Sequence, residues 1–373
     1  MESYRVLVTD GTGFLGSAIV KALTEQKQYA VTMLDIKPPS SDMPSFSPVR
    51  YFQADVLNLD SIQKVFKEIK PSIVVHTVGV SPAGNARYSQ DGKTALSEIN
   101  VNGTKNVLDA ARQTGVQAFV YTSSCTVVTD DVDHDYPNYD ETIQTGNATL
   151  IYGQLKVCPY INLYLNTDEQ KTAAENLVVS ANSTTLRTCA LHPSIIFGPG
   201  DVQGIPTIHA CVSKWETPFI IGSGTNLFDF VYVSNVADAH VLAISNLLTS
   251  GSAAGQASRT PNGEPVPFRD FCLVIWAEFG HAPSFEVRIP KRLAWVLGCF
   301  AEYVTEVTGT QATLSRGSVK NACGVRYANL EKAKRVLGYK PKVGLAEGMK
   351  MACQVISSLH SLPHLLTVCN AVL

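Results

Sequence analysis

A glycine-rich turn near the N-terminus constrains this chain more than any other feature. Val6–Val8 has the apolar, β-branched composition of a buried strand. Gly11, Gly13 and Gly16 follow it, at the start of a segment with helical apolar spacing. Such glycines allow a tight turn and let the backbone approach a pyrophosphate, which the amides of the helix N-terminus then bind. The order strand, turn, helix predicts the first unit of a dinucleotide-binding fold.

A second apolar strand supports this prediction. Residues 30–35 end in Asp35, 19 positions after Gly16. An acid there suits the ribose hydroxyls of the adenosine, which favours NAD over NADP as the cofactor. Within the turn, Phe14 and Leu15 are also expected to lie against the cofactor.

Strand and helix patterns alternate through the first half of the chain, as a parallel sheet requires. The predicted strands are 49–56, 72–79, 118–124 and 186–191, and the predicted helices are 95–114 and 168–181. The pattern predicts an α/β, Rossmann-type doubly wound parallel sheet with a smaller C-terminal substrate lobe. Residues 1–200 and about 226–260 are assigned to the dinucleotide-binding domain, about 201–225 and 261–350 to the lobe, and 351–373 to a C-terminal extension.

Charge and cysteine content exclude several classes of function. The formal net charge of -2 gives no electrostatic support for a nucleic-acid partner. Nine cysteines without CxxC or Cys/His spacing favour reduced thiols and an intracellular location. The first strand begins directly at the N-terminus, so we expect no signal peptide and a cytoplasmic protein, with peripheral contact to an internal membrane as the alternative.

One apolar stretch needs a separate interpretation. Residues 293–301 are too short to span a bilayer. We expect a lobe helix packed on the core; the alternative is a surface segment at about 290–305 that contacts a membrane or admits an apolar substrate.

Several strings resemble the extended short-chain dehydrogenase/reductases, and within them the 3β-hydroxysteroid dehydrogenase/isomerase and sterol-4α-carboxylate 3-dehydrogenase group. The resemblance runs from residue 5 to about 350. The strings are VTDGTGFLGS at 8–17, NGTKNVL at 102–108, VYTSS at 120–124, IIFGPGD at 195–201, NLFDFVYVSNVADAH at 226–240 and LGYKP at 337–341.

The resemblance implies a tyrosine that moves the proton, a lysine four residues later that holds the nicotinamide ribose, and a hydroxyl that binds the substrate oxygen. Counting back from Gly198 identifies Lys171 as the lysine, which places Thr167 where the tyrosine belongs. An aliphatic hydroxyl is too weak an acid for that role. Tyr164 is the predicted replacement phenol, with an ordered water as the alternative proton carrier. Ser124 is the predicted oxygen-binding hydroxyl, with Ser123 and Thr126 as alternatives.

A literal YxxxK also occurs at Tyr152–Lys156. The motif requires a helix that places both side chains on one face. Pro159 is expected to break such a helix, so this match is given less weight.

Three further departures from the family pattern lie near the expected cofactor. Asp10 replaces the first glycine; it tolerates a left-handed turn, but a carboxylate about 5 Å from a pyrophosphate costs on the order of 3 kcal/mol. Val78 replaces a small residue and His192, before Pro193, replaces an arginine. By the family pattern the cofactor-binding set comprises Asp10, Gly11, Gly13, Phe14, Leu15, Gly16, Asp35, Asp55, Val56, Val78, Lys171, His192 and Pro193.

The remaining polar candidates have structural interpretations. Asn102 is expected to help position the lysine or to be a packing amide, and Asp55 otherwise caps the next helix. His76 and His240 are expected to be buried structural imidazoles. The acids at 130–135 are expected to be solvated and to bind no metal.

The sequence thus predicts an NAD(P)-linked oxidoreductase acting on a hydroxyl or ketone of a polycyclic sterol- or terpenoid-like molecule, with a non-standard proton relay. A redox-silent isomerase or cyclase that needs no cofactor is the alternative, and a non-enzymatic binding protein is a third. The family resemblance also implies a homodimer built on helices 95–113 and 168–181.

Overall fold

The computed structural model describes residues 3–39, 48–82, 84–88, 92–143, 145–157, 174–308 and 314–360. Its main sheet has seven parallel strands in the order β12-β7-β5-β4-β1-β2-β3. Their bounds are β1 Tyr4–Thr9, β2 Tyr29–Asp35, β3 Arg50–Gln53, β4 Ile73–His76, β5 Ala118–Thr122, β7 Arg187–Pro193 and β12 Gln256–Thr260. The strand order reverses between β1 and β4, where doubly wound sheets bind their ligands. The predicted fold class is confirmed.

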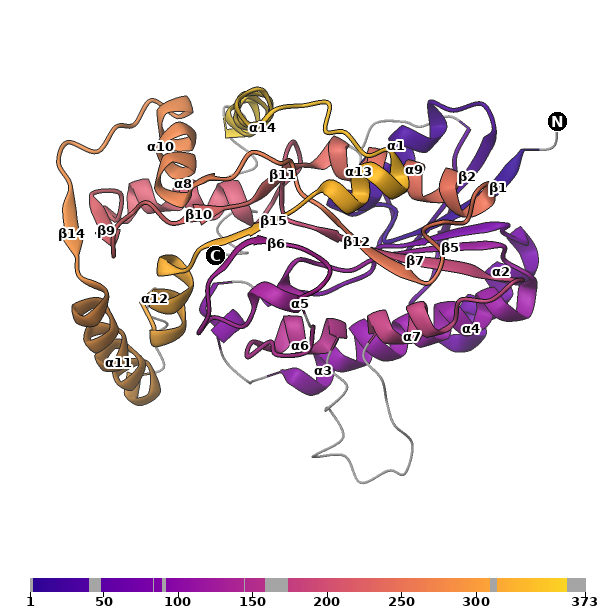
Figure 1. Ribbon diagram of the computed structural model, residues 1–373, viewed down its shortest axis with the longest axis horizontal. Helices are drawn as coiled ribbons and strands as arrows, with labels where there is room; N and C mark the ends of the chain where they lie inside the picture. Colours follow the sequence, from indigo (N-terminus) through magenta and orange to yellow (C-terminus); the bar gives the residue numbers. More distant parts are fainter. Residues whose placement is uncertain are drawn as a thin grey trace.

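Helices cover both faces of this sheet (Figure 1). On one face, α1 (Phe14–Thr24) and α9 (Val233–Leu248) pack against each other over a largely apolar layer. On the other face lie α2 (Leu59–Ile69), α4 (Thr104–Thr114) and α7 (Ala174–Ser180). The buried β-branched strands between these two layers supply most of the core, as expected for parallel strands.

The predicted helix at 95–114 is three segments in succession. It consists of α3 (Lys93–Ser97), a π-helical turn η2 (Glu98–Gly103) and α4. Wide π turns inside helices are uncommon and often mark functional positions. Of the predicted helix at 168–181, residues 168–173 lie outside the described residues.

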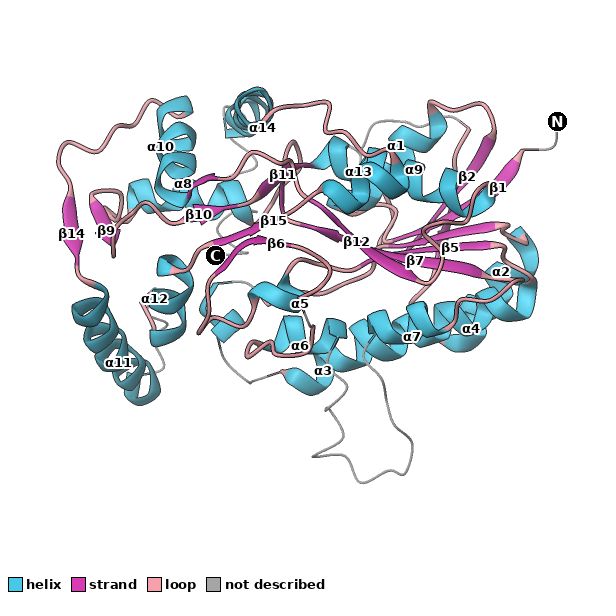
Figure 2. Ribbon diagram, viewed as in Figure 1, coloured by secondary structure: helices cyan, strands magenta, loops and turns pink. Residues whose placement is uncertain are grey.

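The lobe lies beyond the carboxyl ends of the main strands (Figures 1 and 2). Its four-stranded sheet has the order β13-β10-β15-β6, with β13 Val266–Pro267, β10 Leu227–Phe228, β15 Arg326–Ala328 and β6 Tyr136–Tyr139. Two strand pairs accompany it: β11 (Phe230–Tyr232) with β8 (Ile195–Phe197), and β14 (Val287–Ile289) with β9 (Phe219–Ile221). Its helices are α8 Gly204–Ser213, α10 Phe268–Glu278, α11 Lys291–Thr308, α12 Arg316–Cys323 and α14 Leu345–His360, while α13 (Glu331–Leu337) returns to pack on α9.

The segment after β5 contributes to the lobe. β6 comes from the polar stretch expected to be a loop, and it pairs with β15, almost two hundred residues later. Such a long-range pairing leaves little local signal in four residues. Near the other end of the lobe, the predicted boundary at residue 226 falls just before β10 and β11, and the chain rejoins the main domain at α9.

The prediction that 293–301 packs on the core is wrong. These residues form part of α11, in which only Ala294 and Gly298 are buried. The small Gly298 lets α11 approach the start of α12, since a Cβ there would lie 2.9 Å from the Ser315 carbonyl carbon. The other large apolar side chains of α11 face solvent: Leu293, Trp295, Val296, Leu297, Phe300, Tyr303 and Val307. No helix in the described part of the chain is long and apolar enough to cross a membrane.

Candidate active site

The glycine turn ends β1 and begins α1, as predicted. A Cβ at Gly16 would lie 1.9 Å from the Asp10 carbonyl oxygen, and one at Gly11 would lie 2.8 Å from the Met33 Cβ. Neither position can therefore carry a side chain. Gly13 is the N-cap of α1 in an extended conformation, which leaves the helix N-terminus uncovered by any capping side chain. This is the arrangement that binds a pyrophosphate.

Asp10 adopts the left-handed conformation that the sequence analysis allowed, with φ of 52°. Its carboxyl group lies over Gly13: a Cβ built on that glycine would be 2.4 to 2.8 Å from the carboxyl atoms. The Asp10 carboxyl receives no hydrogen bond from the described residues, so it has not turned away to bond nearby amides. Burial, and then the charge of Asp35, raise the Asp10 pKa to about 7.

Asp35 ends β2 beside this turn. Its Oδ2 accepts hydrogen bonds from the Thr12 hydroxyl at 2.6 Å and the Thr12 amide at 3.2 Å, and its Oδ1 accepts one from the Lys37 amide at 3.1 Å. These bonds fix the carboxylate next to the glycine turn, where the sequence placed a ribose ligand.

The neighbouring positions at the strand ends differ in exposure. Val56 is buried, and Val78 is partly buried against the apolar layer under α2. Asp55 accepts a hydrogen bond from the Leu57 amide, and the N-cap of α2 is Asn58, so the capping role suggested for Asp55 is wrong.

His76 and His240 have the structural roles expected of them. His76 lies between the hydroxyls of Thr9 and Thr104, at 2.8 and 3.0 Å, and burial lowers its pKa to about 3. His240 bonds the Thr122 hydroxyl and the Val236 carbonyl oxygen, both at 2.8 Å, and burial lowers its pKa to about 4. Both rings therefore remain neutral at physiological pH.

The short helix α6 (Ile151–Val157) corrects the weight given to the YxxxK match. The argument against it was that Pro159 would break the helix. The described part of the helix runs to Val157, so Tyr152 and Lys156 lie one turn apart on one face, and Pro159 lies outside the described residues.

Asp130 anchors the beginning of α6. It follows α5 (Thr126–Thr129), and its carboxylate accepts a hydrogen bond from the Gly153 amide at 3.0 Å. Its carbonyl oxygen accepts bonds from the amides of Thr149 and Leu150. A seven-residue helix is marginal by itself, so these bonds and its packing hold it in place.

Lys156 lies at the carboxyl end of β5. Its Nζ donates to the Tyr121 hydroxyl and the Thr122 carbonyl oxygen, both at 3.0 Å, and the side chain is 1% exposed. Burial lowers the Lys156 pKa to about 8, while the charge of Glu175 opposes the shift.

The polar ends of Tyr152 and Lys156 converge after β4. A Cβ built on Gly79 would lie 2.9 Å from Lys156 Nζ and 3.6 Å from the Tyr152 hydroxyl oxygen. The ammonium also lies 5.7 Å from the Tyr152 ring centroid. Burial raises the pKa of the Tyr152 phenol, and the nearby Arg87 guanidinium opposes that shift. A phenol and an ammonium thus meet at the carboxyl edge of the sheet, the arrangement that the family resemblance requires.

Behind Lys156 lies a buried polar network. Glu175 of α7 accepts hydrogen bonds from Ser123 and from His192 Nε2, the latter at 2.7 Å. Arg259 of β12 lies 3.1 Å from the other His192 ring nitrogen and stacks over the Tyr139 ring. Both His192 nitrogens are therefore engaged inside the protein, although the sequence analysis placed this residue at the cofactor.

Ser124 is the second residue after β5 and is half-buried, and its hydroxyl oxygen accepts a hydrogen bond from the Thr126 amide at 3.2 Å. Of the alternatives, Ser123 is bonded to Glu175, and Thr126 is buried in α5. The Thr126 hydroxyl has no partner among the described residues, but it is buried; of the three, Ser124 is the one that is partly exposed to a ligand.

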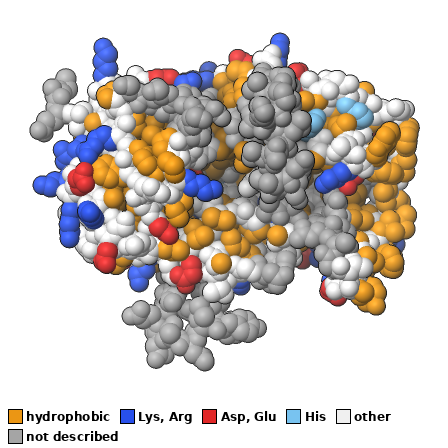
Figure 3. Space-filling view, turned by 180° about the vertical axis from the view of Figure 1, so that it is seen from behind, with side chains coloured by type: hydrophobic (Ala, Val, Ile, Leu, Met, Phe, Trp, Pro, Cys, Tyr) orange, Lys and Arg blue, Asp and Glu red, His pale blue; other side chains and the backbone are white. Residues whose placement is uncertain are grey.

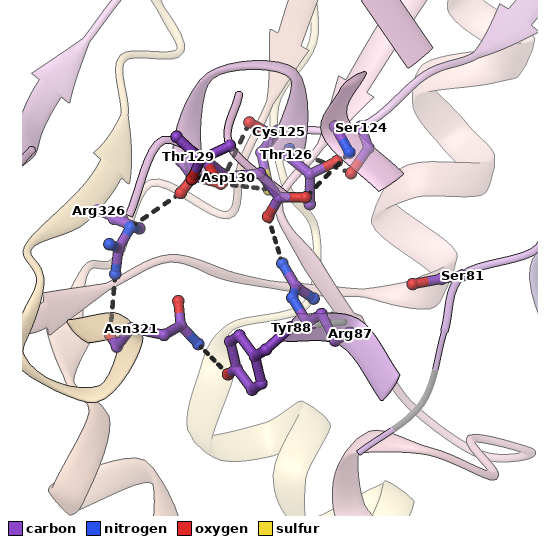
Figure 4. A network of polar contacts seen from close by, with 12 residues as sticks. Ser81, Arg87, Tyr88, Ser124, Cys125, Thr126, Thr129, Asp130, Asn321 and Arg326 are labelled. Carbon is purple, nitrogen blue, oxygen red and sulfur yellow. Dashed lines mark hydrogen bonds and ion pairs between the residues drawn. The ribbon is translucent and has the colours of Figure 1, made fainter. Parts of the chain in front are cut away.

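Figure 4 shows the polar groups beside Ser124. The Arg87 guanidinium, from the turn η1 (Gly84–Tyr88), pairs with Asp130 at 2.5 Å. From the lobe, Arg326 bonds the Thr129 carbonyl oxygen and Asn321 bonds the Tyr88 hydroxyl. These contacts join the lobe to the loops that carry Ser124 and α6.

The buried asparagine near the lysine is Asn100, two positions before the predicted Asn102. Asn102 is half-exposed and bonds Glu98, whereas Asn100 is fully buried in the π turn. Asn100 Oδ1 accepts from the Val80 amide at 2.8 Å, and its Nδ2 donates to the Val80 carbonyl oxygen at 2.9 Å. It therefore holds the segment that carries Gly79 against the face of Lys156. The burial of Asn100 within a wide helical turn had no sequence signal.

The acids at 130–135 fall into two groups: Asp133 and Asp135 are exposed, as expected, whereas Asp130 and Asp131 are buried. Asp130 pairs with Arg87, Asp131 with His134 and Tyr136, and Asp133 with Lys320. Asp135 accepts the Val325 amide. No group of His, Cys, Asp and Glu in the described ranges is suited to a metal ion.

Three predicted catalytic residues, Tyr164, Thr167 and Lys171, lie outside the described residues. Their assignment stays a prediction. The geometry of Tyr152 and Lys156 supplies a complete pair without them.

Comparisons with known proteins give one family match and a set of similar relatives. Residues 7–291 match the model of the 3-beta hydroxysteroid dehydrogenase/isomerase family. The chain is 33% identical over 342 residues to a decarboxylating sterol-4-alpha-carboxylate 3-dehydrogenase of Schizosaccharomyces pombe, covering 91% of this chain and 94% of the relative. It is 31% identical over 366 residues to the mouse (Mus musculus) decarboxylating sterol-4-alpha-carboxylate 3-dehydrogenase, covering 97% and 92%.

Solved structures share the fold at lower identity. A UDP-glucose 4-epimerase of Thermus thermophilus, solved in complex with NAD, is similar with a TM-score of 0.67 and 21% identity, covering 95% of this chain and 99% of that one. A Thermotoga maritima UDP-glucose 4-epimerase, solved with UDP-glucose, has a TM-score of 0.70 and 19% identity, with the same coverage.

Proposed function

This chain belongs to the 3-beta hydroxysteroid dehydrogenase/isomerase family, and we propose that it oxidises the 3β-hydroxyl group of a carboxylated sterol-like substrate with a nicotinamide dinucleotide. The observation that carries the proposal is the convergence of the Tyr152 hydroxyl and Lys156 Nζ beside Gly79. The redox-silent alternative depended on the loss of the tyrosine, and a phenol in this position removes the reason for it.

The residues at the strand ends fit such a cofactor. The uncapped N-terminus of α1 and the close-packed glycines would hold the pyrophosphate, and Asp35 would hold the adenosine ribose. Lys156 would hold the nicotinamide ribose. A carboxylate at the end of β2 repels a 2′-phosphate, so we propose NAD rather than NADP. When bound, the nicotinamide ring accepts the hydride from the substrate carbon.

The chain's own groups handle the proton. Tyr152, as the phenolate, takes the proton of the substrate hydroxyl and becomes the phenol as the carbon–hydrogen bond breaks, and the Ser124 hydroxyl binds the same oxygen. The Lys156 ammonium stabilises the phenolate that must be present at the start of this step. Tyr121 and Thr122 fix that ammonium, and Glu175 supports its positive charge.

A carboxylate next to the reacting hydroxyl has a candidate partner in Arg87. The Arg87 Nε is buried without a hydrogen-bond partner among the described residues. The Arg87 charge also acts to lower the pKa of the Tyr152 phenol, against the effect of burial. Oxidation of a hydroxyl beside a carboxyl-bearing carbon gives a β-keto acid, which can lose carbon dioxide. The printed names of the relatives describe such decarboxylating enzymes.

The test is incubation of the purified protein with NAD⁺ and a 4α-carboxy-3β-hydroxysterol. We expect an absorbance increase at 340 nm and a 3-keto product that has lost 44 mass units as carbon dioxide, by mass spectrometry, with a smaller rate for NADP⁺. Conversion of the substrate in the absence of any dinucleotide would contradict the proposal and support the isomerase or cyclase.

The exposed face of α11 supports peripheral contact with an internal membrane from the cytoplasmic side. Phe300 is 67% and Val307 68% exposed, and basic Arg288, Lys291 and Arg292 stand at the beginning of the helix. Figure 3 shows apolar side chains along the edge of the molecule where the lobe ends. Exposed apolar residues next to cations are typical of segments that bind anionic bilayers.

Sedimentation with phosphatidylserine-containing vesicles tests this membrane contact. We expect Phe300→Ser combined with Val307→Ser to weaken vesicle binding, and Val274→Ser on α10, also an exposed apolar side chain, to leave it unchanged. Equal binding by all three proteins would contradict it.

A homodimer also remains a proposal. The helices α4 and α7 lie side by side on one face of the main sheet, where a symmetry mate would complete a four-helix interface. Light scattering during size-exclusion chromatography would give twice the chain mass if the proposal is right, and the chain mass itself if it is wrong.

A further inference from the structure

Asp10 occupies the face of the glycine turn that the cofactor approaches. In dinucleotide-binding turns the second glycine is small so that the pyrophosphate can come close to the backbone. Here the Asp10 carboxyl atoms lie 2.4 to 2.8 Å from the position of a Cβ on Gly13. The carboxyl group therefore covers the place that a phosphate oxygen must reach, and it extends there from a backbone in the left-handed conformation.

We propose that Asp10 couples cofactor binding to the uptake of one proton: the neutral carboxyl group donates a hydrogen bond to the pyrophosphate, and the carboxylate repels it. This inference rests on the dinucleotide cofactor of the proposed function and adds a proton-dependent step to its binding.

The surroundings of Asp10 favour the neutral form. Asp35, on β2, accepts three hydrogen bonds beside the turn, and its charge opposes a second negative charge nearby. Burial acts in the same direction and together they bring the Asp10 pKa to about 7. A carboxyl that titrates near neutrality can change its charge within the working range of an enzyme.

The other titratable groups around the cofactor site are few. On β4, His76 stays neutral because burial lowers its pKa to about 3. After β2, Lys37 contacts Asp35 through its backbone amide. On α6, the Lys156 pKa is lowered to about 8, so loss of that proton also weakens cofactor binding at high pH. A variant at position 10 separates the two effects.

The sign of the pH dependence follows directly. Below pH 7 Asp10 is neutral and the affinity is highest. Above pH 7 the free protein must take up a proton before the tight complex forms, so the dissociation constant rises by up to about tenfold per pH unit. The dissociation constant levels off once the protein with an ionised Asp10 binds the cofactor directly. The affinity is then about a hundredfold lower, which is the cost of one unit charge about 5 Å from the pyrophosphate.

The experiment is fluorescence titration of NADH at pH 6, 7, 8 and 9 with the wild type and Asp10→Asn. Asparagine keeps the shape and tolerates the left-handed backbone. Asp10→Gly is a second variant that relieves the backbone, and circular dichroism checks that each protein is folded. Calorimetry at pH 8 in two buffers of different ionisation enthalpy measures the proton uptake.

We expect the wild-type dissociation constant to rise on the order of a hundredfold from pH 6 to pH 9, with nearly one proton taken up at pH 8. In Asp10→Asn and Asp10→Gly only the smaller Lys156 effect should remain. Wild-type binding that shows the same pH slope as both variants would overturn the proposal while leaving the cofactor in place. Absence of NADH and NADPH binding at pH 6 in all three proteins would overturn the cofactor assignment as well.

Discussion

Replacement of Lys156 tests the site assignment quantitatively. The ammonium lies 5.7 Å from the Tyr152 ring centroid. At an effective dielectric constant near 20, a charge pair at about 6 Å is worth roughly 3 kcal/mol. If this interaction stabilises the phenolate during proton transfer, its loss corresponds to about a hundredfold decrease in kcat.

The assay is NADH formation at 340 nm with the wild type, Lys156→Met and Lys171→Met. We expect the first variant to lose about a hundredfold in kcat, with a further rise in KM for the cofactor because the ribose loses its partner. Lys171→Met should stay within about twofold of the wild type. Thermal unfolding of each variant shows whether the protein is folded, because Lys156 also satisfies two buried oxygen atoms.

The opposite result would refute the reasoning. If Lys171→Met loses the activity and Lys156→Met keeps it, the family lysine is Lys171, which was identified by counting back from Gly198. The chemistry would then need a proton carrier other than Tyr152.

Two further predictions concern the network behind the lysine. Removal of residues 157–171 would join Lys156 to Thr172 and place Glu175 four residues after Lys156, on the same helical face. Because the Glu175 charge already acts on Lys156, we expect a folded protein with dehydrogenase activity. An aggregated product would contradict this prediction. Glu175→Ala should lower the free energy of unfolding by about 3 kcal/mol in urea denaturation, because it leaves His192 and Ser123 buried without the carboxylate that they bond. Glu25→Ala, at the end of α1, is the control and should change it by less than about 0.5 kcal/mol.

The main sheet could be predicted because its strands carry local signals. Each buried strand is a short apolar run, and the glycine turn and Asp35 follow at the spacing that a dinucleotide site needs. The lobe could not be assembled in the same way, since β6 pairs with β15 across the chain and its strands have two to four residues.

The catalytic pair illustrates a different limit. Counting back from Gly198 leads to Lys171, and the literal YxxxK match leads to Lys156. The sequence favoured the first count because Pro159 was expected to break the second helix. Two turns of helix are enough to align Tyr152 with Lys156, and α6 has that length before the proline. Helix propensity and the position of a proline do not show that a contact from outside the helix, here from Asp130, holds a short helix in place.

The exposed face of α11 was misassigned for a related reason. Its apolar residues surround most of the helix, which is typical of a buried helix in a sequence. Whether a neighbour covers such a helix depends on the packing of the whole lobe. Here α12 covers only the narrow face of Ala294 and Gly298.

The central claim is that Tyr152 carries the proton, and one measurement tests it most directly: kcat for Tyr152→Phe, compared with Tyr164→Phe, in the NAD⁺-dependent oxidation of a 3β-hydroxysterol. The account predicts a loss of at least about a thousandfold for Tyr152→Phe and no more than a twofold change for Tyr164→Phe. Full activity of Tyr152→Phe would contradict it.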